Sequence, residues 1–104
     1  MKQFGLKPEQ IDALSRCFAK YPAIEQVILY GSRAKGNFKD GSDIDLTIID
    51  SDMTFSELLQ LENMLDDLLL PYKIDLSLKR QISNAELVEH IERAGKLFYE
   101  RQVS

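Results

Sequence analysis

Residues 31–45 read Gly-Ser-Arg-Ala-Lys-Gly-Asn-Phe-Lys-Asp-Gly-Ser-Asp-Ile-Asp, and this stretch decides the fold of the chain. One apolar run, residues 27–30, precedes it, and a second, residues 46–49, follows it. Both runs are short and rich in β-branched residues, which predicts two buried strands joined by a polar connection. Because the connection is tight, the two strands can run antiparallel.

The polar connection carries two features that suit a ligand. In a strand, residues two apart project from the same face, so Asp43 and Asp45 point together while Ile44 points into the core. Two carboxylates directed at one point favour a bound cation. The turn at Gly31 and Ser32 can open a helix, and the free backbone N–H groups of a helix start suit a phosphate. Together these features indicate a site for a metal-bound nucleotide.

The other elements follow from hydrophobic periodicity and turn signals. We expect helices over residues 7–21, 54–70 and 83–94, a short helix or turn over residues 32–37, and strands over residues 25–30, 43–50, 72–78 and, at an edge, 97–99. A helix between the second and third strands implies a right-handed parallel crossover, so these two strands should be neighbours. The sequence therefore predicts an α/β (α+β) fold, a small mixed sheet of three to four strands flanked by helices, in one domain over residues 1–104.

Two helix starts carry capping boxes. Thr54 with Glu57 begins the second long helix, and Ser83 with Glu86 begins the last one. The apolar positions of helix 54–70 cover roughly 240° of its circumference, more than the single stripe of a surface helix. Either the first and last helices cover this wide arc, or part of it contacts another protein chain.

Asp75 adds a third carboxylate. If the second and third strands are parallel neighbours, Asp75 stands beside Asp43 and Asp45. Two unit charges about 4 Å apart repel each other by about 4 kcal/mol at an effective dielectric near 20. Protons or a divalent ion must offset this repulsion, and oxygen-only ligands suit Mg²⁺ best. Three carboxylates can hold one ion, or two ions about 3.5–4 Å apart.

With this spacing the chain resembles the DNA polymerase β-like nucleotidyltransferase superfamily. The matching signature is Gly31-Ser32, ten further residues, Asp43-Ile44-Asp45, and Asp75 downstream. Gly-Ser-Arg-Ala-Lys-Gly and Ser-Asp-Ile-Asp-Leu are most similar to its minimal nucleotidyltransferase (MNT) branch, whose prokaryotic members consist of the catalytic core alone. The resemblance extends from Ile24 to about Tyr99, and it implies the nucleotidyltransferase fold.

The resemblance also implies roles for the signature residues. Asp43 and Asp45 would hold the metal ions that bridge the nucleoside triphosphate, and Asp75 would bind the catalytic ion and assist deprotonation of the attacking hydroxyl. Gly31 would let the backbone approach the phosphates, and Ser32 would donate its hydroxyl and N–H to them.

Five other residues near this signature receive separate interpretations. For Arg33 two remain open: a nucleotide-binding charge near the phosphates, or a solvated helix residue. We expect Lys35 to be solvated. The single histidine, His90, is expected to face solvent or an interface and not to be a ligand. Tyr30 and Tyr72 flank the site, where core or edge packing is the ordinary role of such residues.

Sites of this kind transfer a nucleoside monophosphate to a hydroxyl and release pyrophosphate. In the MNT branch the usual partner is a small helical HEPN protein, and the pair behaves as toxin and antitoxin. The resemblance therefore implies an antitoxin that uses Mg²⁺ and ATP to place AMP on a tyrosine of a HEPN-type partner. Two alternatives stay open: a non-catalytic antitoxin that covers its partner, and a small-molecule nucleotidyltransferase, for example one acting on an aminoglycoside. The acceptor, the base preference, the oligomeric state and the stoichiometry are also open.

Composition narrows the function classes. A net charge of −4, from 13 basic and 17 acidic residues, argues against a broad nucleic-acid-binding surface, which needs a basic face. The lone Cys17 allows no internal disulfide and is expected to be a small core residue. There is no apolar run of membrane length and no signal-peptide pattern near Met1, so we expect a cytoplasmic protein.

Overall fold

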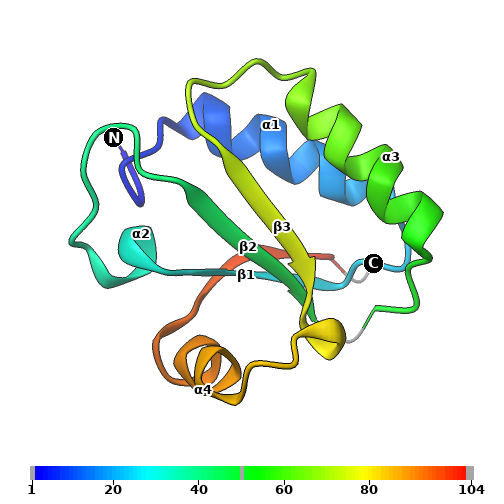
Figure 1. Cartoon of the computed structure of the whole chain (residues 1–104). Coiled ribbons are helices and arrows are strands. Elements are labelled where there is room, and N and C mark those ends of the chain that lie inside the picture. The colour runs from blue at the N-terminus through cyan, green and yellow to red at the C-terminus, as the bar shows by residue number, and fades with distance from the viewer. Residues whose placement is uncertain (1, 50, 103–104) are drawn as a thin grey trace.

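The computed structural model describes residues 2–49 and 51–102. Its helices and strands, in chain order, are α1 (Pro8–Ala19), β1 (Gln26–Tyr30), α2 (Ser32–Lys35), β2 (Ile44–Ile49), α3 (Phe55–Asp66), β3 (Ile74–Leu78), the 3₁₀ turn η1 (Lys79–Gln81), α4 (Ala85–Ala94) and β4 (Lys96–Glu100) (Figure 1). The four strands form one sheet in the order β3-β2-β1-β4. β1 runs antiparallel to β2 and β4, whereas β2 and β3 are parallel. The predicted mixed sheet and its parallel crossover are confirmed.

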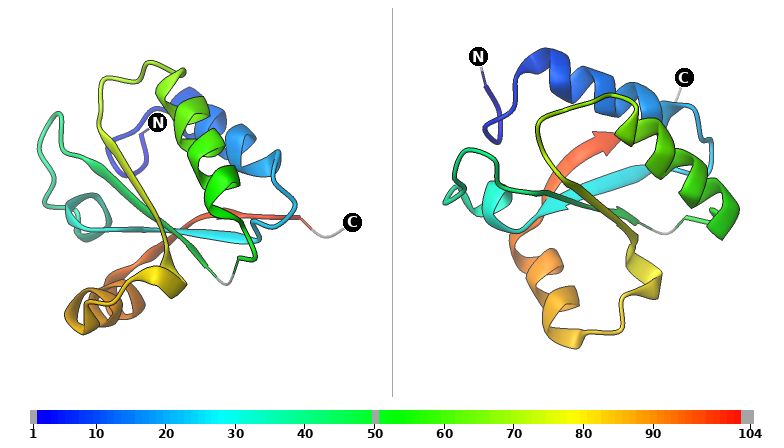
Figure 2. Two further views of the ribbon diagram at one scale, coloured as in Figure 1. Left: turned by 45° about the vertical axis from the view of Figure 1, so that its right-hand side comes forward. Right: turned by 45° about the horizontal axis from the view of Figure 1, so that its top comes forward.

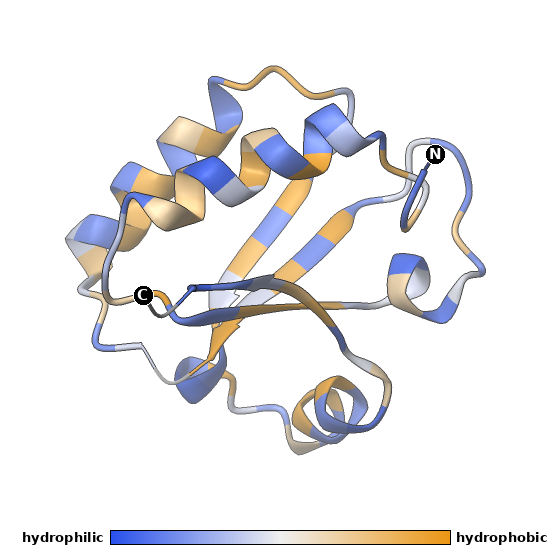
Figure 3. Ribbon diagram, turned by 180° about the vertical axis from the view of Figure 1, so that it is seen from behind, coloured by the Kyte–Doolittle hydropathy of each residue, from blue (hydrophilic) through white to orange (hydrophobic). Residues whose placement is uncertain are grey.

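Helices lie on both faces of this sheet. α1 and α3 lie side by side over one face, and α4 lies against the other (Figures 1 and 2). Ile44, Leu46 and Ile48 of β2 are fully or almost fully buried and belong to the core beneath α1 and α3. Hydrophobic and hydrophilic residues alternate along the strands (Figure 3). The residues between the buried ones therefore face the α4 side.

α3 has the predicted start and an earlier end. The Thr54 side chain accepts from Glu57 N–H at 3.1 Å, and the Glu57 carboxylate accepts from Thr54 N–H at 3.0 Å, so the predicted capping box is present. The helix was expected to reach residue 70 but ends at Asp66. Leu69 has a φ of +54°, a left-handed conformation that cannot continue a helix. The chain thus leaves the helix before Pro71 can act as its terminator.

The start of α4 corrects a second prediction. Asn84, not Ser83, is the N-cap, and its side-chain oxygen accepts from Glu86 N–H at 2.9 Å and Leu87 N–H at 3.1 Å. Asn84 has an extended backbone, from which a short polar side chain can reach the second and third residues of the helix. Ser83 lies one residue too early for this contact.

The remaining boundaries coincide with those expected or differ from them by one or two residues. β3 begins at Ile74 where residues 72–78 were expected, and α1 ends at Ala19 where residue 21 was expected. Asp43 precedes β2, and Asp50, the expected end of that strand, lies outside the described residues. Cys17 is 5% exposed and belongs to the core, as expected.

Part of the wide apolar arc of α3 stays uncovered. Phe55 is 67% exposed and Leu59 45% exposed, and their spacing of four residues places them on one side of the helix. α1 packs against α3, but α4 lies across the sheet, so the expectation that the last helix covers α3 is wrong. No helix of the described part of the chain is long and apolar enough to span a membrane.

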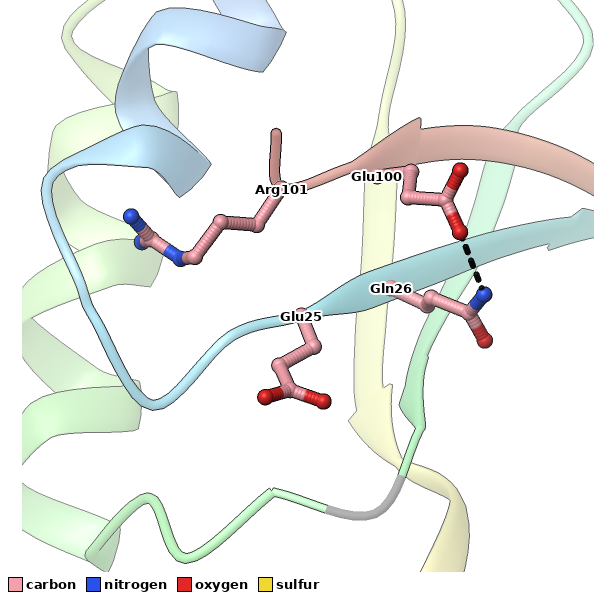
Figure 4. A pocket seen from close by; sticks show the side chains of 4 residues that line it. All are labelled: Glu25, Gln26, Glu100 and Arg101. Carbon is pink, nitrogen blue, oxygen red and sulfur yellow. Dashed lines mark hydrogen bonds between the residues drawn. The ribbon is translucent and has the colours of Figure 1, made fainter. Parts of the chain in front are cut away.

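The first and last strands meet at the end of the sheet away from residue 31. Arg101 points toward the end of α1 and donates to the carbonyl oxygens of Tyr21, at 2.7 Å, and Ile24, at 3.1 Å (Figure 4). Beside it, Gln26 Nε2 donates to the Glu100 carboxylate at 2.8 Å. The shallow hollow there, of about 180 Å³, is lined by Glu25, Gln26, Glu100 and Arg101. It lies at the start of β1, whereas the acidic residues described next lie near its end.

Candidate active site

Two aspartates are neighbours at one end of the parallel strand pair, and a third lies just before β2. Asp45 and Asp75 are Cα partners in the β2–β3 ladder, so their side chains leave the same face of the sheet. Asp43 lies two residues before Asp45, just ahead of the first residue of β2, and its charge acts on Asp45. Ile44 N–H donates to the carbonyl oxygen of Lys73 at 2.8 Å, which fixes the start of β2 against the segment entering β3. The register thus places Asp45 and Asp75 side by side, as predicted, whereas Asp43 lies outside the ladder.

The environment of Asp45 disfavours its ionised form. Burial raises the pKa of Asp45, and the negative charges of Asp75 and Asp43 raise it further. His90 and Lys73 oppose this rise. Each of these effects has the expected sign, because burial and like charges both disfavour the ionised form of a carboxyl group. The site is therefore a region of concentrated negative charge.

The bend after β1 lies directly against this cluster. Gly31 has φ +79° and ψ −156°, a conformation open essentially only to glycine. A Cβ atom at residue 31 would collide with Oδ2 of Asp45. Ser32 follows as the first residue of α2 and is partly exposed. The glycine therefore allows the backbone that begins α2 to approach the Asp45 carboxylate closely.

This combination of fold and acidic site matches a known family. The sequence model of the family described as "Polymerase beta, Nucleotidyltransferase" matches residues 12–104. The chain belongs to this family. The family predicted from the signature is confirmed, and with it the enzyme class: the protein is a nucleotidyltransferase. No curated protein sequence matches the chain.

Solved structures share the fold of this nucleotidyltransferase. A toxin–antitoxin complex with AMP-PNP contains a chain with TM-score 0.67 and 23% identity, covering 93% of this chain and 76% of that one. A MntA–HepT toxin–antitoxin complex contains a chain with TM-score 0.66 and 16% identity, covering 91% of this chain and 74% of that one. A complex of tri-AMPylated Shewanella oneidensis HEPN toxin with MNT antitoxin contains a chain with TM-score 0.65 and 17% identity. The match covers 89% of this chain and 71% of that one. At these identities the likeness shows the common fold, in agreement with the predicted class.

The aspartates of the nucleotidyltransferase fit a hard divalent cation by their chemistry. Within residues 2–49 and 51–102, no three His, Cys, Asp or Glu side chains form a ready-made ion site. Carboxylate oxygens are nevertheless the ligands that Mg²⁺ prefers. A divalent ion would also offset the repulsion that raises the pKa of Asp45. Asp43, Asp45 and Asp75 are therefore the residues that would hold it.

Arg33 is not solvated. Its side chain is 2% exposed, and Nε and Nη2 donate to the carbonyl oxygen of Ser42 at 3.1 and 2.9 Å. Nη1 donates to the carbonyl oxygen of Phe4 at 2.8 Å. The guanidinium carbon lies 4.6 Å from the ring centre of Tyr72 and 5.2 Å from that of Phe38. Arg33 thus holds the loop that leads into the aspartates, and Lys35, as expected, is exposed.

A hollow of about 350 Å³ lies beside this arginine. It is lined by Lys2, Gly5, Arg33, Phe38, Lys39, Asp40, Gly41, Pro71 and Tyr72. The loop that forms one of its walls continues through Ser42 into Asp43, but none of Asp43, Asp45 and Asp75 lines the hollow. Tyr72 is half-buried here, and Tyr30 is buried at the end of β1, in line with the packing roles expected of both.

His90 is the residue that sequence reasoning missed. It is half-buried, and its Nε2 accepts from Gly31 N–H at 3.2 Å. Its ring meets the Tyr30 ring edge-on, with centroids 6.3 Å apart and planes at 77°. His90 is therefore not simply solvent-facing, and the alternative of an interface residue stays a prediction. A usable signal existed, because His90 lies three residues after Leu87 and one before Ile91, on the inward stripe of α4.

Proposed function

We propose that this nucleotidyltransferase transfers AMP from ATP, with Mg²⁺, to a tyrosine hydroxyl of a HEPN-type protein partner and thereby acts as its antitoxin. The observation that carries the proposal is the pairing of Asp45 with Asp75, with Asp43 just before β2 and the Gly31 bend against Asp45. Two structural relatives support the choice of substrates. One is a toxin–antitoxin complex with AMP-PNP, and another contains an AMPylated HEPN toxin.

In this proposal each residue has a defined task. Ser32 donates its N–H and hydroxyl to the phosphates, and Gly31 provides the close approach. The acceptor oxygen attacks the α-phosphorus, the bond to pyrophosphate breaks, and Asp75, which is exposed, assists removal of the hydroxyl proton. Mg²⁺ held by Asp43, Asp45 and Asp75 would neutralise phosphate charge. The proposal treats residues 1–104 as one catalytic domain acting in the cytoplasm.

A second candidate function is binding without catalysis. The exposed Phe55 and Leu59 lie on α3, across the sheet from the aspartates, so a partner could cover this surface whether or not the site reacts. In that case Phe55→Ser with Leu59→Ser would abolish co-purification with the partner, and the aspartates would be dispensable for protection of cells.

Transfer of label from [α-³²P]ATP tests the first proposal. The chain is incubated with Mg²⁺ and a HEPN-type protein, and any label is located by residue, with a tyrosine expected. Asp43→Asn with Asp45→Asn should abolish transfer, whereas Asp66→Asn, an exposed aspartate at the end of α3, should leave it unchanged. No transfer by the wild type, or equal transfer by the double variant, would remove the catalytic proposal. Label on an aminoglycoside instead of the protein would favour the small-molecule alternative.

A further inference from the structure

The amide of Gly31 has a partner from a distant part of the chain. Gly31 N–H donates to Nε2 of His90, which lies 59 residues away on α4. The other atoms at this bend are fixed by the strand before it and the helix after it. The Lys35 N–H, for example, returns to the carbonyl oxygen of Gly31 at 3.1 Å. The side chain of His90 thus connects the backbone of this bend to α4.

α4 is itself held firmly against the sheet. A Cβ at Gly95, just after the helix, would meet Cγ2 of Ile28 on β1 at 2.5 Å, so helix end and strand are in close contact. Ile91 is 4% exposed, and the His90 ring packs edge-on against Tyr30. The acceptor nitrogen of His90 therefore has a fixed position relative to β1. The hydrogen bond from Gly31 N–H to this nitrogen holds the Gly31 amide in place.

From these contacts we infer that His90 is a positioning residue for nucleotide binding, which holds the Gly31 bend against Asp45. The inference rests on the proposed function, because it assigns the phosphates to the start of α2. Since Gly31 N–H is engaged by His90, that amide is not available to phosphate, and the proposed donor at this bend is the amide of Ser32. His90 acts through the bend and does not touch the reacting atoms.

Nitrogen NMR gives a test that needs no activity. His90 is the only histidine in the sequence, so a ¹⁵N-histidine-labelled protein gives one pair of ring-nitrogen signals. In protein labelled with ¹⁵N at both histidine and glycine, we expect an unprotonated Nε2, a protonated Nδ1 and a through-hydrogen-bond coupling between Nε2 and the Gly31 amide nitrogen. A protonated Nε2, or no coupling to Gly31, would overturn the inference.

Three variants test the effect on nucleotide binding. His90→Leu removes the acceptor, whereas His90→Gln keeps an acceptor oxygen near the position of Nε2. Glu89→Gln is the matched control, because Glu89 is exposed and pairs only along α4 with Arg93. The apparent affinity for AMP-PNP with Mg²⁺ should fall about tenfold in His90→Leu and recover to within about threefold in His90→Gln, as expected for one lost hydrogen bond.

Kinetics separate positioning from chemistry. A contact that supports the phosphates equally before and during reaction changes KM and leaves kcat nearly unchanged. We therefore expect His90→Leu to raise the KM for ATP about tenfold with kcat within about twofold of wild type. If both His90 variants lose kcat to the same extent, the imidazole has a chemical role and the inference is wrong. Unchanged AMP-PNP affinity in His90→Leu would also overturn it. A wild type that transfers no AMP would sink the proposed function while the NMR result still stood.

Discussion

The carboxylate of Asp45 occupies the space that a side chain at residue 31 would need, so Gly31 and Asp45 fit together only because residue 31 has no Cβ. This relationship joins the two halves of the sequence signature. The bend that starts α2 and the strand that carries the aspartate are in contact, and their separation leaves no room for even one methyl group.

Gly31→Ala should therefore be costly for both folding and activity. The backbone of residue 31 is in a region essentially reserved for glycine, which costs another residue about 1–3 kcal/mol, and the new methyl group would displace Asp45. Gly36→Ala is the matched control, because Gly36 also has a positive φ, +87°, but no atom within 4 Å of a built Cβ. Urea denaturation and AMP transfer should both separate the two variants. Equal losses would show that the contact with Asp45 is unimportant.

The stability of the protein should depend on pH through Asp45. Its pKa is raised in the folded state, so the folded protein binds the proton more tightly than the unfolded chain does, and stability falls as pH rises through the ordinary carboxyl range and above it. Asp45→Asn should then increase the free energy of unfolding at pH 7. The gain should shrink as the pH is lowered toward about 4, near the ordinary value of an aspartate. Urea denaturation at several pH values measures this, and a variant less stable than wild type at pH 7 would contradict it.

Mg²⁺ should stabilise the wild type against heat. An ion that binds only the folded state adds about 2.7 kcal/mol when its concentration is one hundred times its Kd. Thermal melts with Mg²⁺ and then with EDTA should show a reversible rise in Tm. Asp45→Asn with Asp75→Asn should lose that rise, and Asp66→Asn should keep it. A wild-type Tm that does not respond to millimolar Mg²⁺ would count against the metal site.

Arg33→Lys should destabilise the loop that precedes the aspartates. A lysine cannot reproduce the planar fork that donates to both Ser42 and Phe4, and the loss of charged hydrogen bonds at a buried position costs about 2–3 kcal/mol. Lys35→Ala, an exposed change in the same short helix, should cost much less. Urea denaturation gives the stability difference. A near-neutral Arg33→Lys would mean that the buried contacts contribute little.

Local sequence was sufficient for the sheet and for the acidic cluster. The short apolar run at residues 46–49, rich in β-branched residues, identified β2, and the helix between the strands implied that β2 and β3 are parallel. The side-by-side placement of Asp45 and Asp75 followed from these two inferences. Such features depend on the period of a strand and on the handedness of a crossover, both of which can be read from neighbouring residues.

Long-range contacts could not be read in this way. Arg33 is buried because it reaches Phe4, 29 residues earlier, and His90 is held by Gly31, 59 residues earlier. The early end of α3 reflects the left-handed conformation of Leu69. No glycine or proline before Pro71 indicates this end in the sequence. In each case the deciding partner is distant in sequence or the deciding conformation has no local signature.

The place of β4 in the sheet has a consequence for synthesis. β4 pairs with β1, so residues 96–100 complete a ladder begun by residues 26–30, and they leave the ribosome after everything that forms the acidic cluster. A nascent chain that has emerged as far as η1 can already pair β2 with β3, yet one edge of β1 remains unpaired and open to other strands. Until β4 pairs with β1, the exposed backbone N–H and C=O groups of β1 can pair with strands of other chains. A binding partner or chaperone that covers this edge would protect the nascent chain from aggregation.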